Sequence, residues 1–208
     1  MHNLSDKLAA GLRSLEFNLD EVTQERLLQF LDLLAKWNKA YNLTAVRDKE
    51  QMLTRHILES LTLTPYLYGK NILDVGTGAG IPGIPLAIVF PEKNLYLVDS
   101  NSKKTRFLNQ VKIELKLSNV FVFHERVENL DFSFEFDQIL SRAFADVATT
   151  VKLLDDLWSS DTVLSLMKGP GVNEELAMLH QNIDINIIEL QAPEQTEFRC
   201  LAELKHRS

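Results

Sequence analysis

The sequence has little that could cross-link the chain and no stretch that could anchor it in a membrane. Its one cysteine, Cys200, excludes an internal disulfide, and we expect this side chain to be buried as a small apolar group. The longest strongly apolar run, 81–90, is too short to cross a bilayer and contains two prolines. The first residues lack the basic and apolar regions of a signal peptide, so we expect a cytoplasmic location and no membrane partner.

An excess of positive charge is also lacking. The chain of 208 residues has 22 Lys and Arg against 29 Asp and Glu, which gives a formal net charge of -7. This balance argues weakly against a nucleic-acid partner, because such binding depends on a local basic face and not on the sum. The length suits one domain with a modest addition, and the hydrophobic share of 45% is ordinary for a globular protein.

The first third of the chain has the spacing of helices. We predict helices over 5–16, 20–39 and 50–63, and we treat residues 1–66 as an N-terminal helical extension. The second of these helices carries an apolar stripe, which we interpret as core: Leu27, Phe30, Leu31, Leu34 and Trp37.

The rest of the chain, 67–208, alternates short apolar strands with helices and is predicted to form one compact domain. The predicted strands are 71–75, 94–99, 120–123, 136–141, 162–167, 184–190 and 198–204. Helices at 82–89, 103–116 and 145–157 separate the earlier strands, which indicates a mostly parallel sheet. The last two strands have only a short link and should be antiparallel. This α/β pattern is typical of the Rossmann-like fold of class I methyltransferases, with a seven-stranded sheet.

A glycine-rich loop follows the first predicted strand, and its spacing fits two kinds of cofactor site. Gly76, Gly78 and Gly80 satisfy the G-x-G-x-G pattern of methyltransferases. Gly78, Gly80 and Gly83 satisfy the G-x-G-x-x-G pattern of dinucleotide enzymes. In both classes an acid about twenty residues further along, here Asp99, holds the ribose hydroxyls. The glycine spacing therefore does not choose between them.

The charges around this loop favour S-adenosylmethionine over a dinucleotide. Asp74 would repel a pyrophosphate at the start of the following helix, whereas it suits the sulfonium and ammonium of S-adenosylmethionine. Free backbone N–H groups at the helix start would suit the carboxylate of that cofactor. No Lys or Arg, which a phosphate cradle would often use, occurs between Asp74 and Val89. We therefore predict a methyltransferase, with a dinucleotide enzyme and a plain glycine-rich turn as alternatives.

Six segments spread over the chain carry a more specific pattern. They are residues 36–44, 55–60, 74–85, 99–100, 126–128 and 141–144. The Trp-Asn-x-x-Tyr-Asn-Leu-Thr run and the loop with two prolines are the most specific of them. With these segments the chain resembles, over nearly its whole length, the bacterial ribosomal RNA small subunit methyltransferase G family, also called glucose-inhibited division protein B.

The resemblance implies an activity and a cofactor site. The family methylates N7 of a guanine in the decoding-region loop of 16S rRNA, using S-adenosylmethionine, so the implied partner is this RNA or the small ribosomal subunit. The implied cofactor-site residues are Gly76, Ile81, Val127, Glu128 and Arg142. In this fold the loop after the third strand lies beside the adenine, although a solvated acid is the simpler interpretation of Glu128 alone.

Contact with RNA requires a basic face. We expect it from residues of the helical segment and of the helix near the glycine loop, which are Lys36, Lys39, Arg47, Arg55, Lys103, Lys104 and Arg106. For each of them a solvated helix face is the simpler explanation.

Three further residues follow predicted strands on the substrate side. Arg142 would bind the cofactor carboxylate or an RNA phosphate. Phe144 would stack on a base or pack in the core, and Lys168 would meet a phosphate or be solvated.

We name no catalytic base and no metal. Guanine N7 carries a free lone pair, so its methylation removes no proton, and orientation of the reactants carries most of the effect. His56 and Glu59 are too few for a metal site, and we interpret them as a structural pair. Three rival hypotheses remain: a methyltransferase of the same fold with another substrate, a nicotinamide-dependent oxidoreductase, and a non-catalytic RNA-binding module.

Overall fold

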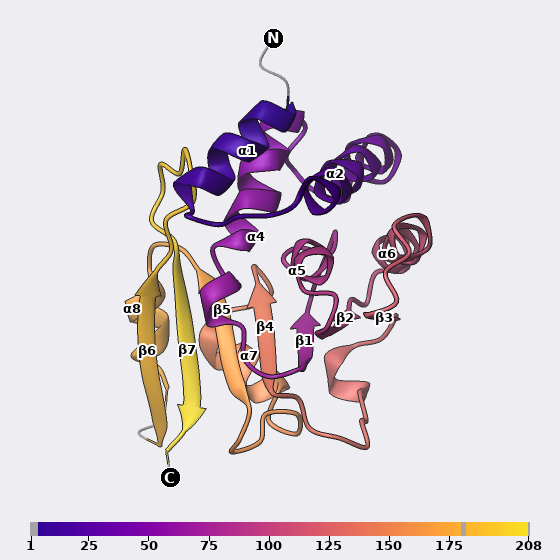
Figure 1. Ribbon diagram of the computed structural model, residues 1–208. Coiled ribbons are helices and arrows are strands. Elements are labelled where there is room, and N and C mark those ends of the chain that lie inside the picture. The colour runs from indigo at the N-terminus through magenta and orange to yellow at the C-terminus, as the bar shows by residue number, and fades with distance from the viewer. Residues whose placement is uncertain (1–3, 180–181, 208) are drawn as a thin grey trace.

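The computed structural model describes residues 4–179 and 182–207 (Figure 1). Its N-terminal part is helical, with α1 (Leu4–Ser14), α2 (Glu21–Tyr41), α3 (Lys49–Met52), η1 (Leu53–Leu58), α4 (Glu59–Leu61) and η2 (Thr64–Tyr66). The α2 helix begins at Glu21 because the Asp20 carboxylate accepts a hydrogen bond from the backbone N–H of Thr23. The predicted third helix is one run in which η1, a π-helical stretch, separates α3 from α4.

Seven strands form one sheet in the order β3-β2-β1-β4-β5-β7-β6. Their bounds are β1 (Asn71–Val75), β2 (Asn94–Val98), β3 (Val120–Phe123), β4 (Gln138–Arg142), β5 (Val163–Lys168), β6 (Ile183–Glu189) and β7 (Cys200–His206). The first five strands pair in parallel, while β7 is antiparallel to both β5 and β6. The predicted fold class and the antiparallel end of the sheet are confirmed.

Helices cover both faces of the sheet. The remaining helices are α5 (Gly83–Val89), α6 (Ser102–Glu114), η3 (Val127–Asn129), α7 (Val147–Leu153) and α8 (Val172–Leu176). The α5 and α6 helices lie on the same side as the N-terminal helices, and α7 and α8 lie on the other side (Figure 1). The N-terminal helices thus form an outer layer over one face of the sheet.

One hydrophobic core runs from the N-terminal helices to the sheet, so that Leu8 of α1 and Leu201 of β7 belong to the same buried cluster. The predicted stripe of α2 is buried, except that Trp37 is half-buried and packs on Phe107 of α6. Cys200 is fully buried, as expected. The division of the chain at residues 66 and 67 stays a prediction.

Some boundaries differ from the prediction. The α7 helix ends at Leu153, because the chain turns there and brings Trp158 into the core, where its Nε1 donates to the carbonyl oxygen of Thr162. The short α8 helix was not predicted. None of the helices in the described ranges is long and apolar enough to cross a membrane.

Candidate functional site

A cavity of about 390 Å³ lies at the carboxyl ends of β1, β2 and β4; we call it the cofactor cavity. It is lined by Val75, Gly76, Val98, Asp99, Ser100, Lys104, Glu125, Arg126, Val127, Glu128, Ala143, Phe144, Ala145 and Leu153. Parallel sheets bind ligands at this edge. Of the predicted cofactor residues, the structure brings Gly76, Asp99, Val127 and Glu128 together here.

The glycine loop brings bare backbone to the edge of this cavity. Gly76 has a φ of +64°, a conformation that other residues rarely adopt. A Cβ atom on Gly76 would lie 2.4 Å from Cδ2 of Phe144, which therefore packs against the loop and also lines the cavity. Any side chain at position 76 would require Phe144, which forms part of the cavity wall, to move.

Asp74 lies under the loop and not in the cavity. Its side chain is fully buried, and its Oδ2 accepts hydrogen bonds from Oγ1 of Thr77 at 2.7 Å and from the backbone N–H of Gly83 at 3.0 Å. Burial raises the pKa of Asp74 to about 7. The expectation of a direct contact with the cofactor cation is therefore corrected, because this carboxylate holds the loop in shape.

The backbone N–H groups at the start of α5 are also occupied. Those of Gly80 and Ile81 donate to the carbonyl oxygen of Thr77, and that of Gly83 donates to Asp74. The expectation that free N–H groups at this point receive a carboxylate is wrong for these three residues, because the loop turns back on itself. Gly78, Gly80 and Ile81 shape the loop without lining the cavity.

Asp99 places its carboxylate at the cavity wall. Its Oδ2 accepts from the backbone N–H of Gly78 at 3.0 Å and lies 3.3 Å from Nζ of Lys104, while its Oδ1 accepts from the backbone N–H of Asn101. These bonds fix the side chain beside the glycine loop. Lys104, predicted on the RNA face, lines the cofactor cavity instead.

Val127 and Glu128 lie in η3, directly after β3 and at the opposite wall. Val127 is 5% exposed and offers an apolar surface, whereas the Glu128 side chain is exposed. This position matches the expected one beside an adenine ring, and their role in binding stays a prediction.

Arg142 does not line the cofactor cavity. Its Nη2 donates to Oε2 of Glu59 at 2.8 Å and to the carbonyl oxygen of Arg55 at 3.0 Å. Glu59 also accepts from Nε of Arg199 at 3.2 Å. The geometry of this protein alone thus shows neither of the two roles predicted for Arg142, and both stay predictions.

His56 and Glu59 do not form the predicted structural pair. His56 is buried and its Nε2 lies 2.9 Å from Oγ1 of Thr44, while Glu59 turns to the two arginines. Burial lowers the pKa of His56 to about 4. The pair was predicted from helical spacing, but the π-helical stretch η1 includes His56 and ends at Leu58, next to Glu59, which changes that spacing.

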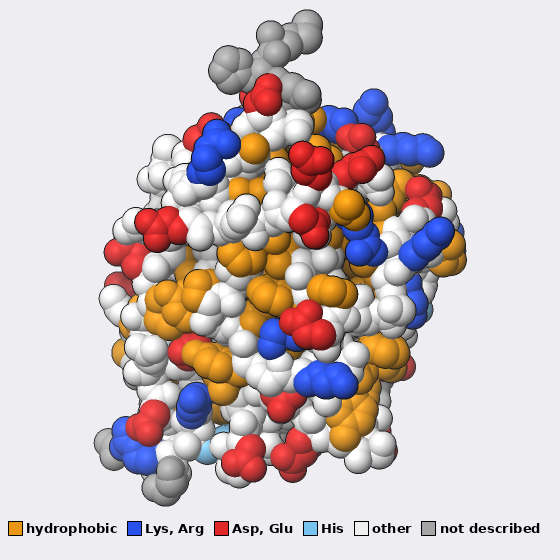
Figure 2. Space-filling model, viewed as in Figure 1, with side chains coloured by type: hydrophobic (Ala, Val, Ile, Leu, Met, Phe, Trp, Pro, Cys, Tyr) orange, Lys and Arg blue, Asp and Glu red, His pale blue; other side chains and the backbone are white. Residues whose placement is uncertain are grey.

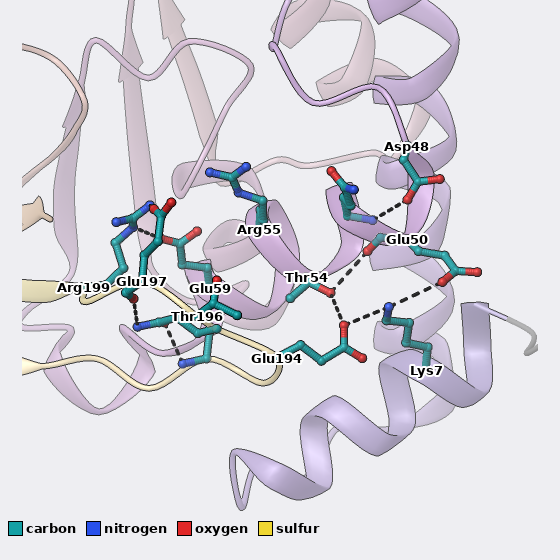
Figure 3. Close-up of a pocket in the computed structure, with 13 residues that line it drawn as sticks. Lys7, Asp48, Glu50, Thr54, Arg55, Glu59, Glu194, Thr196, Glu197 and Arg199 are labelled. Carbon is teal, nitrogen blue, oxygen red and sulfur yellow. Dashed lines mark hydrogen bonds and ion pairs between the residues drawn. The ribbon is translucent and has the colours of Figure 1, made fainter.

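A second cavity, of about 500 Å³, separates the N-terminal helices from the link between β6 and β7 (Figure 3). We call it the arginine cavity, and its lining includes Arg55, Glu59 and Arg199. In Figure 3, Arg199, Glu197 and Glu59 lie together at one end. Arg55, predicted to face RNA, is exposed and lines this cavity.

The other basic candidates fall into separate groups. Lys36, Lys39 and Arg47 line one groove, although Arg47 also donates to Asn38 and Asn42. The α6 helix, which carries the exposed Lys103 and Arg106, packs beside α2, and Figure 2 shows Lys and Arg over this part of the surface with acidic side chains among them.

The Lys168 side chain makes two contacts within the protein. Its Nζ donates to the carbonyl oxygen of Ala145 and pairs with Glu175 at 2.8 Å. It is therefore neither solvated nor placed to meet a phosphate, which corrects both interpretations offered for it.

Two residues with polar roles, Thr77 and Arg199, were missed, and the partner of Glu59 was wrongly predicted. Thr77 holds Asp74, and its position three residues further along could have indicated this bond. Glu59 and Arg199 meet across the fold, and no local pattern predicts that contact. Among the described residues, no group of three metal-binding side chains occurs.

Comparison with known proteins gives consistent matches. A family model described as rRNA small subunit methyltransferase G matches residues 23–200. The ribosomal RNA small subunit methyltransferase G of Pseudomonas aeruginosa (strain LESB58) is 52% identical over 182 residues, which cover 87% of this chain and 85% of that protein. The protein of the same name from Shewanella denitrificans is 42% identical over 205 residues, which cover 98% and 99%.

Solved structures support the fold. The plantazolicin methyltransferase BpumL, solved in complex with SAH, superimposes with a TM-score of 0.58 at 13% identity and covers 89% of this chain and 100% of that chain. At this identity the similarity concerns the fold alone.

Proposed function

This chain belongs to the ribosomal RNA small subunit methyltransferase G family, and we propose that it transfers a methyl group from S-adenosylmethionine to N7 of a guanine in 16S rRNA. It is thus an S-adenosylmethionine-dependent methyltransferase, and the alternatives of another substrate or a nicotinamide-dependent reaction are not favoured. The observation that carries the proposal is the cofactor cavity, which is lined both by Gly76 and by Asp99, whose carboxylate the backbone N–H of Gly78 fixes.

The residues present fit this cofactor better than a dinucleotide. A pyrophosphate would need free N–H groups at the start of α5, but Asp74 and Thr77 already accept the hydrogen bonds of three of them. S-adenosylmethionine has no phosphate, so it does not require a pyrophosphate site at this helix terminus.

Four lining residues of the cofactor cavity are assigned a role in binding, and Arg142 is assigned one from beside it. Asp99 would hold the ribose hydroxyls, and Val127 would pack on the adenine ring, with Glu128 at the edge of that ring. Gly76 would allow the backbone to approach the cofactor closely. Arg142 would complete the site from the end of β4, or contact RNA in the way argued below.

We expect the enzyme to accelerate the reaction mainly by orienting the guanine and the cofactor. When bound, S-adenosylmethionine supplies a methyl group on a positively charged sulfur. Guanine N7 needs no deprotonation, so the task of this chain is to hold the base in line and to exclude water. No base is assigned, and His56, the buried histidine of the helical segment, does not line the cofactor cavity. A single-turnover rate with a dominant ionisation near neutrality that one side chain controls would contradict this.

Residues 1–66 and the start of α6 are proposed to provide the RNA face, while 67–208 hold the cofactor. We propose that the reaction takes place in the cytoplasm, on 16S rRNA either free or within the small subunit, and without a metal. Binding to RNA should weaken steeply as salt rises, because Lys36, Lys39, Lys103 and Arg106 are exposed.

The activity is tested by mapping modified nucleotides in ribosomal RNA by mass spectrometry. RNA is compared from cells with the protein, without it, and with the Asp99→Ala variant. We expect one N7-methylguanine of 16S rRNA to disappear in the second and third samples. An unchanged set of modifications in all three would refute the proposed substrate.

A further inference from the structure

Three arginines from distant parts of the chain lie near Glu59, and two of them, Arg55 and Arg199, line one end of the arginine cavity. Arg55 belongs to η1, Arg142 ends β4, and Arg199 directly precedes β7. Arg142 and Arg199 pair with Glu59, the first residue of α4, and Arg142 also donates to the backbone carbonyl oxygen of Arg55. Figure 3 shows Arg199 beside Glu59 at this end of the cavity, with Arg55 on the adjoining helix.

Glu59 is buried and shared between two guanidinium groups. Its side chain is 7% exposed, and each of its oxygens takes one arginine, Arg142 at 2.8 Å and Arg199 at 3.2 Å. One carboxylate that fixes two guanidiniums leaves an excess of positive charge and restricts the directions of both.

The charge of the cavity differs between its two ends. At the arginine end the charges of the lining residues Arg55, Arg199, Glu59 and Glu197 balance, and the one net positive charge comes from Arg142, which pairs with Glu59 without lining the cavity. At the other end the cation is Lys7, paired with Glu50 at 3.5 Å and Glu194 at 3.0 Å. An anion would therefore be attracted to the arginine end only.

The arginine end still has donors to offer. Among the residues that the structure describes, the hydrogen bonds of Arg142 involve Nη2 alone, and the guanidinium of Arg55 has no hydrogen bond or ion pair. Planar guanidinium groups with unused N–H groups match the oxygens of a phosphodiester.

The third arginine connects this cluster to the cofactor cavity along the chain. Ala143, the residue after Arg142, lines that cavity. The chain therefore passes directly from the arginine that pairs with Glu59 to the wall of the cofactor cavity.

We propose that Arg55, Arg142 and Arg199 form a binding site for a backbone phosphate of the acceptor RNA strand. Glu59 is the positioning residue that orients Arg142 and Arg199. This inference rests on the proposed function and adds to it a contact that fixes the strand beside the methylated guanine. Glu59 touches neither RNA nor cofactor, and it acts through Arg142 and Arg199.

The first test removes one arginine. KM and kcat are measured for unmethylated small ribosomal subunits, or for RNA extracted from them, whichever the unaltered protein methylates. Arg199→Gln should raise KM about tenfold, the value of one charged hydrogen bond, and leave kcat within about twofold. The matched control is Arg207→Gln, near the other end of β7, which removes the same charge and should leave KM unchanged.

The second test removes the positioning group. Glu59→Gln makes the cavity more positive, so charge alone predicts tighter RNA binding, whereas loss of orientation predicts a KM raised about fivefold or more. Glu59→Asp should restore part of the loss. The affinity for S-adenosylhomocysteine, measured by calorimetry, and the melting temperature show whether either variant still folds and binds cofactor.

The outcomes separate the two proposals. If the unaltered protein methylates neither RNA nor subunits, the proposed function fails. If it methylates one of them and Arg199→Gln has the same KM as Arg207→Gln, only the proposed phosphate-binding site is refuted. If Glu59→Gln folds, binds S-adenosylhomocysteine and lowers KM, the positioning role is refuted.

Discussion

The loop beside the cofactor cavity and the helical segment beside the arginine cavity each bury one titratable side chain. Asp74 under the loop has its pKa raised to about 7, and His56 in η1 has its pKa lowered to about 4, in both cases chiefly by burial. Each also has one buried polar atom, Oδ1 and Nδ1, without a hydrogen bond among the described residues. Folding therefore favours the neutral form of both side chains. Asp74 makes the folded protein less stable as the pH rises, and His56 makes it less stable as the pH falls.

The largest expected effect is local to the loop. In Gly76→Ala the new Cβ would lie 2.4 Å from Phe144 at a φ of +64°. Because Phe144 must move, we expect the affinity for S-adenosylhomocysteine to fall about a hundredfold, and the backbone strain of about 1–2 kcal/mol should lower stability as well. Calorimetry measures this loss.

The matched control is Gly171→Ala. Gly171 also has a positive φ, of +90°, but a Cβ there meets nothing closer than 3.9 Å, and it does not line the cofactor cavity. This variant should lose stability and keep its affinity. Equal affinity losses in the two variants would show that the loop has no special place in binding.

Asp74→Asn tests whether the buried Asp74 is protonated in the folded protein. Between about pH 4 and pH 7 the unfolded carboxyl ionises while the folded one stays protonated, so stability falls as pH rises. From pH 5 to pH 8 this loss amounts to about 2–3 kcal/mol, since each pKa unit corresponds to about 1.4 kcal/mol.

The asparagine variant should lack this loss, as measured by urea unfolding at both pH values. Comparing slopes with pH removes the constant cost of altered hydrogen bonds. The exposed Asp161→Asn is the control and should follow the unaltered protein. Parallel pH profiles for Asp74→Asn and the unaltered protein would contradict a protonated Asp74.

His56→Gln tests whether the buried His56 is neutral in the folded protein. Here the unfolded imidazole takes a proton below its ordinary pKa of 6.5, while the folded one stays neutral until about pH 4. Stability therefore falls as pH falls, by about 2 kcal/mol between pH 7 and pH 5. The variant should lack this decrease, and the exposed His124→Gln should keep it. A profile for His56→Gln that still falls by this amount would exclude the buried neutral histidine.

The smallest effect is expected at the far end of the arginine cavity. Lys7→Gln removes two ion pairs whose acidic partners are more than half exposed, so the free energy of unfolding should fall by only about 0.5 kcal/mol. Lys49→Gln, which breaks a surface pair with Asp32, should behave alike. A much larger loss for Lys7→Gln would mean that the link between β6 and β7 depends on this contact.

The loop could be predicted because its parts are neighbours in sequence. A strand, three alternating glycines and a helix follow one another directly, and Asp99 ends the next strand, which pairs with β1 in parallel. The direction of the Asp74 carboxylate could not be predicted in the same way. It depends on Thr77 and Gly83, and their positions are set only when the loop folds back on itself.

The arginine cavity could not be predicted because its contacts join distant segments. Glu59 and Arg199 are 140 positions apart, and they meet only when β7 pairs antiparallel with β5 beneath the N-terminal helices. Helical spacing predicted that Glu59 pairs with His56, whereas in the structure Glu59 forms ion pairs with Arg142 and Arg199. Patterns along the chain thus predict the bare backbone of the glycine loop, but not which acid pairs with which base.

The central claim is that the cofactor cavity prefers a methyl donor without phosphate over a nucleotide that carries one. Calorimetric titration with S-adenosylhomocysteine and with NAD, on the unaltered protein and on Gly76→Ala, tests it most directly. We predict that S-adenosylhomocysteine binds one site per chain, that the variant loses this binding, and that NAD gives no binding heat. Saturable binding of NAD without binding of S-adenosylhomocysteine would contradict the account.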